Sequence, residues 1–596
     1  MSKWLILCMI GLIMLAPFFV PEPLVAQTTP DGRFGMTEVF WLPDEARDLG
    51  VGWERILFYW RELQPEGPGD WNTLHVREEW LAQANAQGRT IVGLIKNTAP
   101  WASLDGTEAG VPKGLYLSLD DPDNLWAGFV QRLAEYYSAR NVHHWIIWNE
   151  PEIEAGVYGF EFAGTVADYY QMLKSAYMVV KEVDPQAVVH LAGLTWWHDP
   201  TFLDQLLALA AEDPGSADND YFFDVISLHI YFRTETVKTI IDEVNVIQER
   251  YGLEKPIWIN ETNAPPNRDP EWPVDRPRFD VDLEQQAWFV LQAMALGFAS
   301  GAERISVYKL LDIHLPPGGE SFGLVRPDYS RRPAYDAYKL ATSCFGLFKA
   351  VTLEEDPVSF HVAFERPAGL SHIAWSRTIT ATTVQITANS DSAKLISWTE
   401  APIQVEPIDG SYLLELPGQR CRDDCIIGGE PVLLVEEYGG RNHVEQCITW
   451  AKDRLTSHDS TEDSELRSIP ESPDLRLEER VWETNATVPP VAPATPVAAQ
   501  IAIPTMTPTG VGTTTSGQAI SVQPHQNSVA AEAMASPTVT SAEPESVPVA
   551  TLGDAGNEAQ ESEALSETIG LWFIGAGIGV ALGMAFYWRR HMWRHH

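Results

Sequence analysis

The sequence predicts an α/β protein with a (β/α)8 TIM barrel at residues 27–349. A small antiparallel β-sandwich at 350–440, a disordered linker at 441–568 and a C-terminal transmembrane helix at 569–588 are expected to follow it. Three observations support this order. Eight short apolar runs alternate with amphipathic helical stretches in the first segment, as a barrel of eight β-then-α units requires. The second segment has short β-rich runs separated by Gly, Pro, Asn and Asp. Within the third, residues 488–553 are dense in Pro, Thr, Ala, Ser and Val without periodicity, and 451–484 is polar and charged.

The barrel competes with one alternative, an open doubly wound sheet. Such a sheet predicts a glycine-rich phosphate loop after a strand, and no apolar run in this chain is followed by one. The barrel is therefore the favoured fold. Its expected strands are 34–36, 55–59, 90–95, 144–149, 188–192, 225–230, 256–260 and 305–310, and the helical stretches between them include 125–140, 167–183 and 283–300.

The β-sandwich prediction rests on alternating or β-rich runs of four to seven residues, each bounded by turn-forming residues. Whether this domain contributes to ligand binding or only braces the barrel stays open. The expected strands are 359–365, 372–376, 382–388, 394–398, 412–415 and 431–435.

The N-terminus has the features of a secretory signal peptide at residues 1–26. Lys3 precedes an apolar run at 4–20, and Ala26 is a small residue before an expected cut ahead of Gln27. Leu24, three residues before that cut, is larger than usual, so an uncleaved anchor is the alternative.

The C-terminus predicts a membrane anchor. Residues 569–588 (Ile569 to Trp588) carry no charge over 20 residues, enough to cross a bilayer. The basic tail at 589–596 is then cytoplasmic and the rest of the chain lies outside. We therefore expect a cell-surface protein held on a tether. Gly575, Gly579 and Gly583 are spaced to pair two such helices weakly, although glycine is common in spans that stay single.

Composition excludes one class of partner. The 596 residues include 41 Lys and Arg against 82 Asp and Glu, a formal charge of −41, which would repel a phosphate backbone. Nucleic acid is therefore not an expected partner. Cys344, Cys421, Cys425 and Cys447 allow three disulfide pairings, with free thiols as the alternative. The chain has no Cys-x-x-Cys pair, and no zinc site is expected.

Two carboxylic acids stand where a barrel places its catalytic groups, at the carboxyl ends of strands. Glu150 ends the fourth expected strand, in Trp148-Asn149-Glu150-Pro151, and Glu261 ends the seventh. Three strands apart in a ring, their side chains can face each other across the mouth. Two facing carboxyl groups suit glycoside hydrolysis, in which one donates a proton and the other attacks the sugar carbon. Solvated loop acids are the alternative.

The two environments must differ, because one acid stays protonated and the other ionised. Arg55 of the second strand can hold Glu261 ionised, and Tyr231, ending the sixth strand, can donate a hydrogen bond to it. Asn149 is a neutral donor suited to a sugar hydroxyl. Arg55 could instead be a structural ion-pair partner.

The stretch 30–345 resembles the retaining glycoside hydrolases of clan A, with phrases nearest to the xylosidase/iduronidase-type and cellulase-type families. The resembling residues are Asn149-Glu150, Glu261, Arg55, Trp60, Pro100-Trp101 and His229-Ile230-Tyr231. One departure is Tyr308-Lys309, where the clan often ends its eighth strand with Trp.

The resemblance implies a double-displacement mechanism on an oligo- or polysaccharide, with Glu150 as acid/base and Glu261 as nucleophile. No metal or cofactor is implied. The expected substrate-binding residues are Arg55, Trp60, Trp101, Asn149, His229, Tyr231 and Tyr308. Core packing is the alternative for Trp60, Trp101 and His229. A catalytically inactive glycan-binding barrel and an envelope-remodelling transglycosylase are the rival functions.

Overall fold

The computed structural model describes residues 29–437, without 158, 275–276, 278, 314–320, 399–401 and 422–424, together with Cys447. The predicted signal peptide, most of the linker, the transmembrane helix and the basic tail lie outside the described residues. Within the described part of the chain, no helix is long and apolar enough to cross a membrane.

The predicted barrel is confirmed: eight parallel strands form one sheet in the order β5-β4-β3-β2-β1-β8-β7-β6. Bridges between His190 and Val225 and between Leu194 and Leu228 join β5 to β6 and close the ring. The strands are β1 (Phe34–Thr37), β2 (Trp53–Tyr59), β3 (Thr90–Lys96), β4 (Val142–Ile147), β5 (Val188–His190), β6 (Ile226–Tyr231), β7 (Ile257–Asn263) and β8 (Ala302–Val307).

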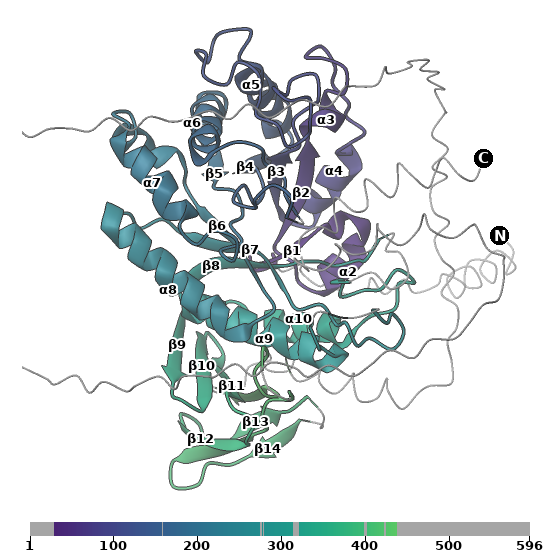
Figure 1. Cartoon of the computed structure of the whole chain (residues 1–596). Helices are drawn as coiled ribbons and strands as arrows, with labels where there is room; N and C mark the ends of the chain where they lie inside the picture. The colour runs from purple at the N-terminus through teal and green to yellow at the C-terminus, as the bar shows by residue number, and fades with distance from the viewer. Residues whose placement is uncertain are drawn as a thin grey trace, which may run out of the picture. The chain divides into compact units, whose positions relative to one another are not determined.

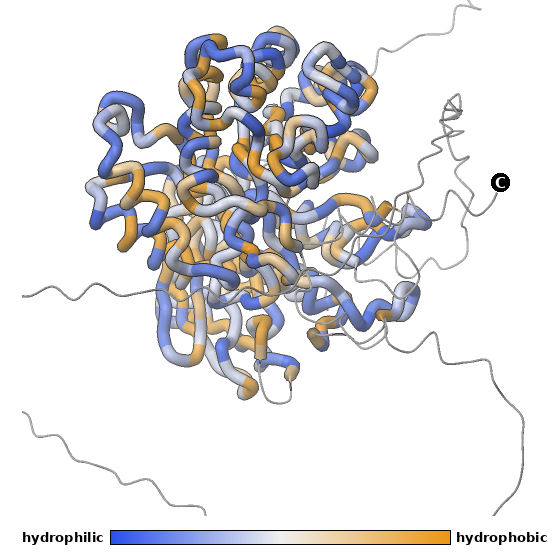
Figure 2. Tube along the Cα trace, turned by 45° about the horizontal axis from the view of Figure 1, so that its top comes forward, coloured by the Kyte–Doolittle hydropathy of each residue, from blue (hydrophilic) through white to orange (hydrophobic). Residues whose placement is uncertain are grey.

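Helices surround this ring (Figure 1). Their buried faces are apolar, and Figure 2 shows hydrophobic segments gathered toward the interior and hydrophilic ones in the outer loops. The helical elements are η1 (Val39–Trp41), α2 (Pro43–Asp48), α3 (Trp60–Leu63), α4 (Glu78–Ala86), α5 (Leu125–Ser138), α6 (Val166–Val183), α7 (Phe202–Glu212), η2 (Ala217–Phe222), α8 (Thr234–Tyr251), α9 (Leu283–Ala299) and α10 (Pro333–Cys344).

The lower part of the barrel is filled by large side chains from several strands. Trp53 and Trp258 pack with ring centroids 5.2 Å apart, in a cluster with Val92, Leu94 and Ile146. A packed floor of this kind leaves the upper, carboxyl end of the strands as the place for a site.

The β-domain consists of two antiparallel sheets with a core of their own, which agrees with the predicted β-rich segment. The six-stranded sheet has the order β14-β13-β16-β11-β10-β9, and the two-stranded sheet β12-β15 packs on it. The strands are β9 (Ala350–Glu355), β10 (Ser359–Arg366), β11 (Gly369–Ser376), β12 (Thr382–Thr387), β13 (Ala393–Ile396), β14 (Ile403–Val405), β15 (Ser411–Leu416) and β16 (Val432–Glu437).

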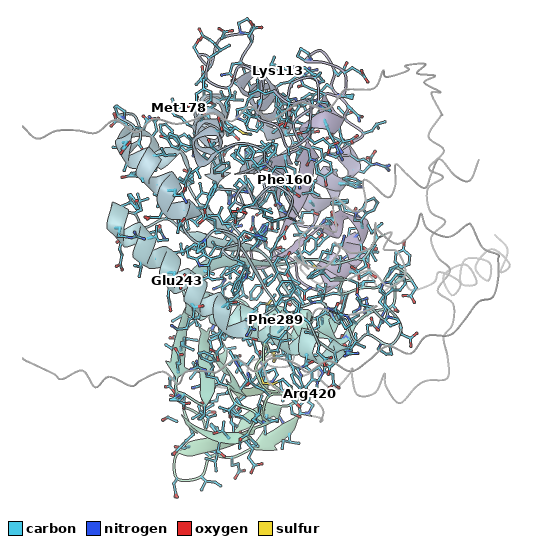
Figure 3. All side chains as sticks on the ribbon, in the orientation of Figure 1. Lys113, Phe160, Met178, Glu243, Phe289 and Arg420 are labelled. Atoms are coloured by element: carbon cyan, nitrogen blue, oxygen red, sulfur yellow. A yellow bond between two sulfur atoms is a disulfide. The ribbon has the colours of Figure 1, made fainter. Side chains whose placement is uncertain are left out.

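The β-domain is joined to the barrel along α9. The buried Gln292 amide accepts from Thr234 Oγ1 (2.8 Å) and Gly428 N (3.1 Å) and donates to Gly429 O (2.7 Å). Arg420 crosses the same boundary and lies 4.1 Å above the Trp288 ring. Figure 3 labels Phe289 of α9 and Arg420 of the β-domain near this contact. Buried hydrogen bonds of this kind fix the relative placement of the two parts.

Two disulfides select one of the three pairings that the sequence left open. Cys344 at the end of α10 bonds to Cys447, and Cys421 bonds to Cys425. The first ties the chain beyond β16 back to the last barrel helix, and the second closes a small loop.

Candidate active site

The two predicted carboxylic acids meet in one site at the carboxyl end of the barrel. Glu150 lies three residues beyond β4, and Glu261 lies within β7, where the pairing register with β8 shifts between Ile259 and Thr262. One oxygen of each carboxyl group and a ring nitrogen of His229 all lie within 4.8 Å of one another. That separation is close to the roughly 5–5.5 Å of direct nucleophilic attack and shorter than the roughly 6.5–9.5 Å that leaves room for a water.

Glu261 is surrounded by groups that favour its charge. Arg55 Nη1 forms a buried ion pair with Oε1, and the Tyr231 hydroxyl donates to Oε2. Burial alone would raise the pKa of Glu261, but the charge of Arg55, together with His229 and the Tyr231 hydroxyl, lowers it below its usual value. Glu261 is therefore held as a carboxylate.

Glu150 has the opposite environment. Its side chain is completely buried, and Oε1 shares a hydrogen bond of 2.5 Å with His229 Nδ1. Burial, followed by the negative charges of Glu261 and Glu161, raises its pKa well above the usual value. Oε2 has no hydrogen-bond partner among the described residues. Glu150 is therefore a protonated acid with one oxygen left for a substrate.

His229 lies between the two acids as a neutral ring. Its Nδ1 is 3.5 Å from Glu261 Oε2, and burial lowers its pKa to about 4. The ring rests against Gly193, where a Cβ would lie 2.0 Å from Nε2. A residue without a side chain is thus required at position 193.

Gly193→Ala is expected to displace the His229 ring and lower kcat, because overpacking costs about 1–3 kcal/mol and breaks the contact with Glu150. Steady-state kinetics and the Tm check this. The matched control is Gly128→Ala on an exposed position of α5, where a Cβ meets nothing within 4 Å. A Gly193→Ala enzyme with unchanged kcat and Tm would contradict the packing argument.

Asn149 is buried beside Glu150, but its amide contacts Glu161, a residue that was not among the predicted site residues. Nδ2 donates to Glu161 Oε2 (3.1 Å), and the same oxygen is paired with Lys96 Nζ. Lys96 ends β3 and Glu161 follows β4, so their pairing depends on tertiary structure. Their only sequence signal is the position of Lys96 at a strand end.

The structure corrects one predicted sugar platform. Trp60 is completely buried, stacks on Phe129 at 4.7 Å and donates from Nε1 to Gln64 Oε1. Its ring belongs to the core, because α3 begins at Trp60 and turns it inward. Trp101 is half-buried and donates from Nε1 to the Gln64 carbonyl (2.7 Å). The structure leaves its platform role a prediction.

Tyr308 follows β8 and lies beside the Glu261 cluster. Its ring is nearly perpendicular to that of Tyr231 at 6.3 Å, and burial together with the charges of Glu38 and Glu261 raises its pKa well above the usual value. The next residue, Lys309, is buried and pairs with Glu38 Oε2 at 3.0 Å. This pair was also absent from the predicted site.

The loops after β7 and β8 are held together by a buried ionic network. Asp269 accepts from Arg326 Nε (2.7 Å) and Nη2 (3.0 Å) and from Arg332 Nε (2.8 Å). Arg332 Nη1 also donates to Asp312 (2.7 Å). Shared charges fix both loops at the rim of the mouth.

The Glu150–His229–Glu261 set resembles a metal-binding group in composition, but its hydrogen bonds suit acid–base chemistry. Both oxygens of Glu261 are already engaged: Oε1 is ion-paired with Arg55, and Oε2 accepts a hydrogen bond from Tyr231. A cation at this position would also be repelled by the Arg55 guanidinium.

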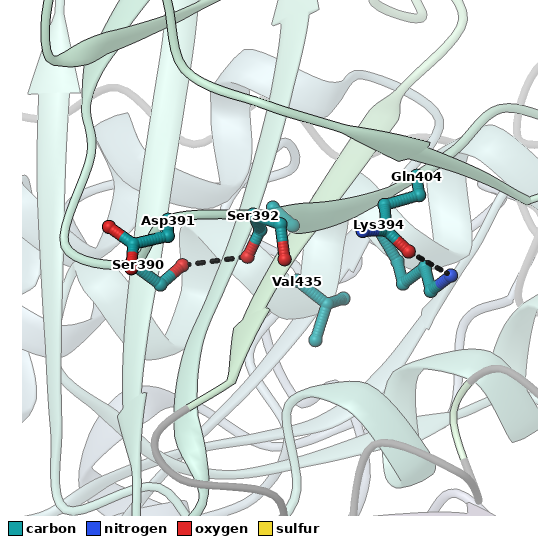
Figure 4. A pocket seen from close by; sticks show the side chains of 7 residues that line it. Ser390, Asp391, Ser392, Lys394, Gln404 and Val435 are labelled. Carbon is teal, nitrogen blue, oxygen red and sulfur yellow. Dashed lines mark hydrogen bonds between the residues drawn. The ribbon is translucent and has the colours of Figure 1, made fainter.

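A separate polar hollow of about 290 Å³ lies in the β-domain (Figure 4). Ser390 Oγ donates to the Ser392 carbonyl (2.8 Å), and Lys394 Nζ lies 3.4 Å from Gln404 Oε1. None of its lining residues is aromatic, so it offers no ring on which a sugar could stack. The lining residues are Ser390, Asp391, Ser392, Ala393, Lys394, Gln404 and Val435.

The fold and the site define a class: a (β/α)8 barrel with an ionised and a protonated carboxyl group facing each other at its mouth. No protein-family model and no curated protein matches the sequence. Among solved structures, the chain is similar to a family 39 glycoside hydrolase from the gut symbiont Bacteroides cellulosilyticus. The two are 17% identical, with 69% of this chain and 82% of that chain covered and a TM-score of 0.52.

Two further similar structures are a xylanase and a xylosidase by their names. The catalytic domain of GH30 xylanase C from Talaromyces cellulolyticus is 13% identical, with 68% and 96% coverage and a TM-score of 0.47. A monomeric beta-xylosidase from Caulobacter crescentus is 14% identical, with 68% and 95% coverage and a TM-score of 0.43. The barrel fold that the resemblance to clan A implies is confirmed by the eight-stranded parallel sheet and by the likeness to the family 39 structure.

Proposed function

We propose that the protein is a retaining O-glycoside hydrolase. The observation that carries this proposal is a pair of carboxyl groups with oxygens within 4.8 Å of each other and with pKa values shifted in opposite directions. The pKa of Glu150 is raised, and that of Glu261 is lowered. The fold shared with a family 39 glycoside hydrolase supports it. An acid and a nucleophile at this separation are what double displacement needs.

In the first step, a Glu261 oxygen bonds to the anomeric carbon while the bond to the leaving oxygen breaks. Glu150 gives its proton to that oxygen. In the second step, ionised Glu150 takes a proton from water, the water oxygen attacks the anomeric carbon, and the bond to Glu261 breaks. Arg55 and Tyr231 hold the Glu261 carboxylate in place for the first step. They also stabilise its negative charge when it leaves the sugar in the second step.

The predicted signal peptide, linker and apolar segment at 569–588 extend the proposal to a location. We infer an enzyme anchored at the cell surface that acts on carbohydrate outside the cell. Weak dimerisation through the glycines of that segment belongs to the same proposal.

A panel of aryl glycosides and polysaccharides, incubated with the whole chain, tests the function. We expect hydrolysis of at least one substrate, with proton NMR showing that the first product keeps the anomeric configuration of the substrate. Inverted product would overturn the mechanism, and affinity without turnover would favour the inactive glycan-binding barrel. Sugar-to-sugar transfer at high acceptor concentration would favour the transglycosylase.

The pH profile of kcat/KM is expected to be bell-shaped. Glu261 must be ionised and its pKa is lowered, so activity falls only at pH values below about 4.5. Glu150 must be protonated and its pKa is raised, so the alkaline limb lies well above 4.5. Rates on one aryl glycoside between pH 3 and 10 check this.

One neighbour makes a useful control for the alkaline limb. Burial raises the pKa of Glu152 to about 7, and its Oε1 accepts from Thr195. Glu152→Gln should keep the alkaline limb if Glu150 causes it. Loss of the alkaline limb in the Glu152→Gln variant would assign that limb to Glu152 and contradict its assignment to Glu150.

A further inference from the structure

The strand end that carries Glu150 is held by the segments on both sides of it. Trp148 and Glu150 have φ angles of 73° and 44°, a left-handed backbone that residues other than glycine rarely adopt. The Trp148 backbone N–H donates to the Ile95 carbonyl in β3 (2.9 Å), and its Nε1 donates to the Glu161 carbonyl (3.2 Å). The turn that carries Glu150 therefore depends on β3 and on the segment around Glu161.

A buried ion pair extends this support into the site. Glu161 Oε2 accepts from Asn149 Nδ2 (3.1 Å) and is paired with Lys96 Nζ, which follows Ile95. The side chains of Lys96 and Glu161 are only 3% and 4% exposed. A carboxylate this deeply buried is costly unless a positive group pairs with it. Lys96 thus makes possible a negative charge directly beside the residue that precedes Glu150.

The two charges of the pair act on Glu150 in opposite directions. Burial is the largest cause of the raised pKa of Glu150, followed by the charges of Glu261, Glu161 and Glu152. Lys96 lowers the same pKa, but by less than Glu161 raises it. The charged and titratable groups around Glu150 are Arg55 of β2, Lys96 of β3, Glu152 and Glu161 after β4, His229 and Tyr231 of β6, and Glu261 of β7.

We propose that Glu161 and Lys96 are positioning residues of the active site: Glu161 fixes the Asn149 amide and keeps the proton on Glu150, and Lys96 holds Glu161 in its charged form. This rests on the proposed function, in which Glu150 must carry a proton when the leaving oxygen departs. Both residues act through Asn149 and Glu150. A pair with the stronger effect from its negative member raises the proton affinity of the acid without adding net charge to the mouth.

Infrared difference spectroscopy of the whole chain follows the proton on Glu150 without a substrate. A protonated carboxyl group has its own C=O stretching band, and the part of that band lost on adding Glu150→Gln to a given chain belongs to Glu150. In Glu161→Gln the amide oxygen can still accept from Asn149, but the negative charge is gone. The titration of Glu150 should therefore move to lower pH by roughly one unit. In Lys96→Met it should move to higher pH, by less.

The alkaline limb of kcat/KM on an aryl glycoside should follow the same order. Glu161→Gln should have the lowest limb and Lys96→Met the highest, and a chain with both changes should lie between them. Circular dichroism checks that each variant is folded, and Lys96→Met carries the test if Glu161→Gln does not fold. The control is Asp242→Asn, which removes a lysine-paired acid from the outer face of α8 and should leave both readouts unchanged.

A purely structural pair would lower the stability of the chain without moving either titration. Titrations that stay in place in both single variants, or that move in the same direction in both, therefore overturn the proposal.

The two proposals fail separately. If the infrared titration moves as expected but the unaltered chain hydrolyses no glycoside, the role of the pair stands and the glycosidase falls. If the chain hydrolyses aryl glycosides while the titration and the alkaline limb stay in place in both single variants, the glycosidase stands and the role of the pair falls.

Discussion

Glu261→Gln is expected to reduce turnover on the order of 10⁶-fold, the scale seen when a catalytic nucleophile is removed. The amide is nearly the same size as the carboxyl group, but it cannot form the bond to the anomeric carbon. The loss should appear in kcat for every substrate, whatever its leaving group. Steady-state rates on aryl glycosides of graded leaving-group pKa measure it.

The Glu261 change also has a stability signature. Arg55 is buried and loses its charged partner, so the variant should unfold more easily by about 3–5 kcal/mol. Circular dichroism establishes that the chain is folded before activity is compared. Glu249→Gln, an exposed carboxyl change on α8, is the control and should match the unaltered protein in rate and Tm.

Rescue by a small anion makes the Glu261 test specific. In Glu261→Ala, azide can enter the space of the missing carboxylate and attack the anomeric carbon, which gives a glycosyl azide of inverted configuration. A variant with residual turnover and retained product would show that another group is the nucleophile.

Glu150→Ala is expected to lower the rate about 10²–10⁴-fold for substrates with poor leaving groups, because no proton reaches the departing oxygen. Substrates with good leaving groups need no such proton, so their first step should be spared. The second step then becomes slow, since no base activates water. The rate as a function of leaving-group pKa therefore becomes steep in this variant.

Azide separates the role of Glu150 from that of Glu261. An anion attacks the glycosyl-enzyme without a base, so added azide should speed Glu150→Ala and yield a glycosyl azide of retained configuration. An equal loss for all leaving groups, or inverted azide product, would contradict the acid/base assignment.

His229 shows where sequence reasoning stopped short. Its place two residues before Tyr231 indicated the mouth, but not that the ring shares a hydrogen bond with Glu150. Gly193, which makes room for the ring, belongs to another strand end and carried no signal in the sequence. The charged pairs show the same limit: Lys96 and Glu161 are 65 residues apart, and Lys309 and Glu38 are 271 apart.

Trp60 shows a different limit. The side chain of a residue that follows a strand can point into the mouth or outward between the helices. Its direction depends on whether the residue continues the strand or begins a helix. Because α3 starts at Trp60, the ring turns toward Phe129 and is lost as a platform.

The sequence by itself determined the alternation of strands and helices and the two strand ends that carry Glu150 and Glu261. It could do so because hydrophobic periodicity is local, and because parallel strands in a ring all end at the same face. Only the tertiary structure decided what His229 touches, that Lys96 pairs with Glu161 and that the Trp60 indole is buried. Those properties depend on burial and on charges brought close from distant parts of the chain, and both arise only when the chain has folded.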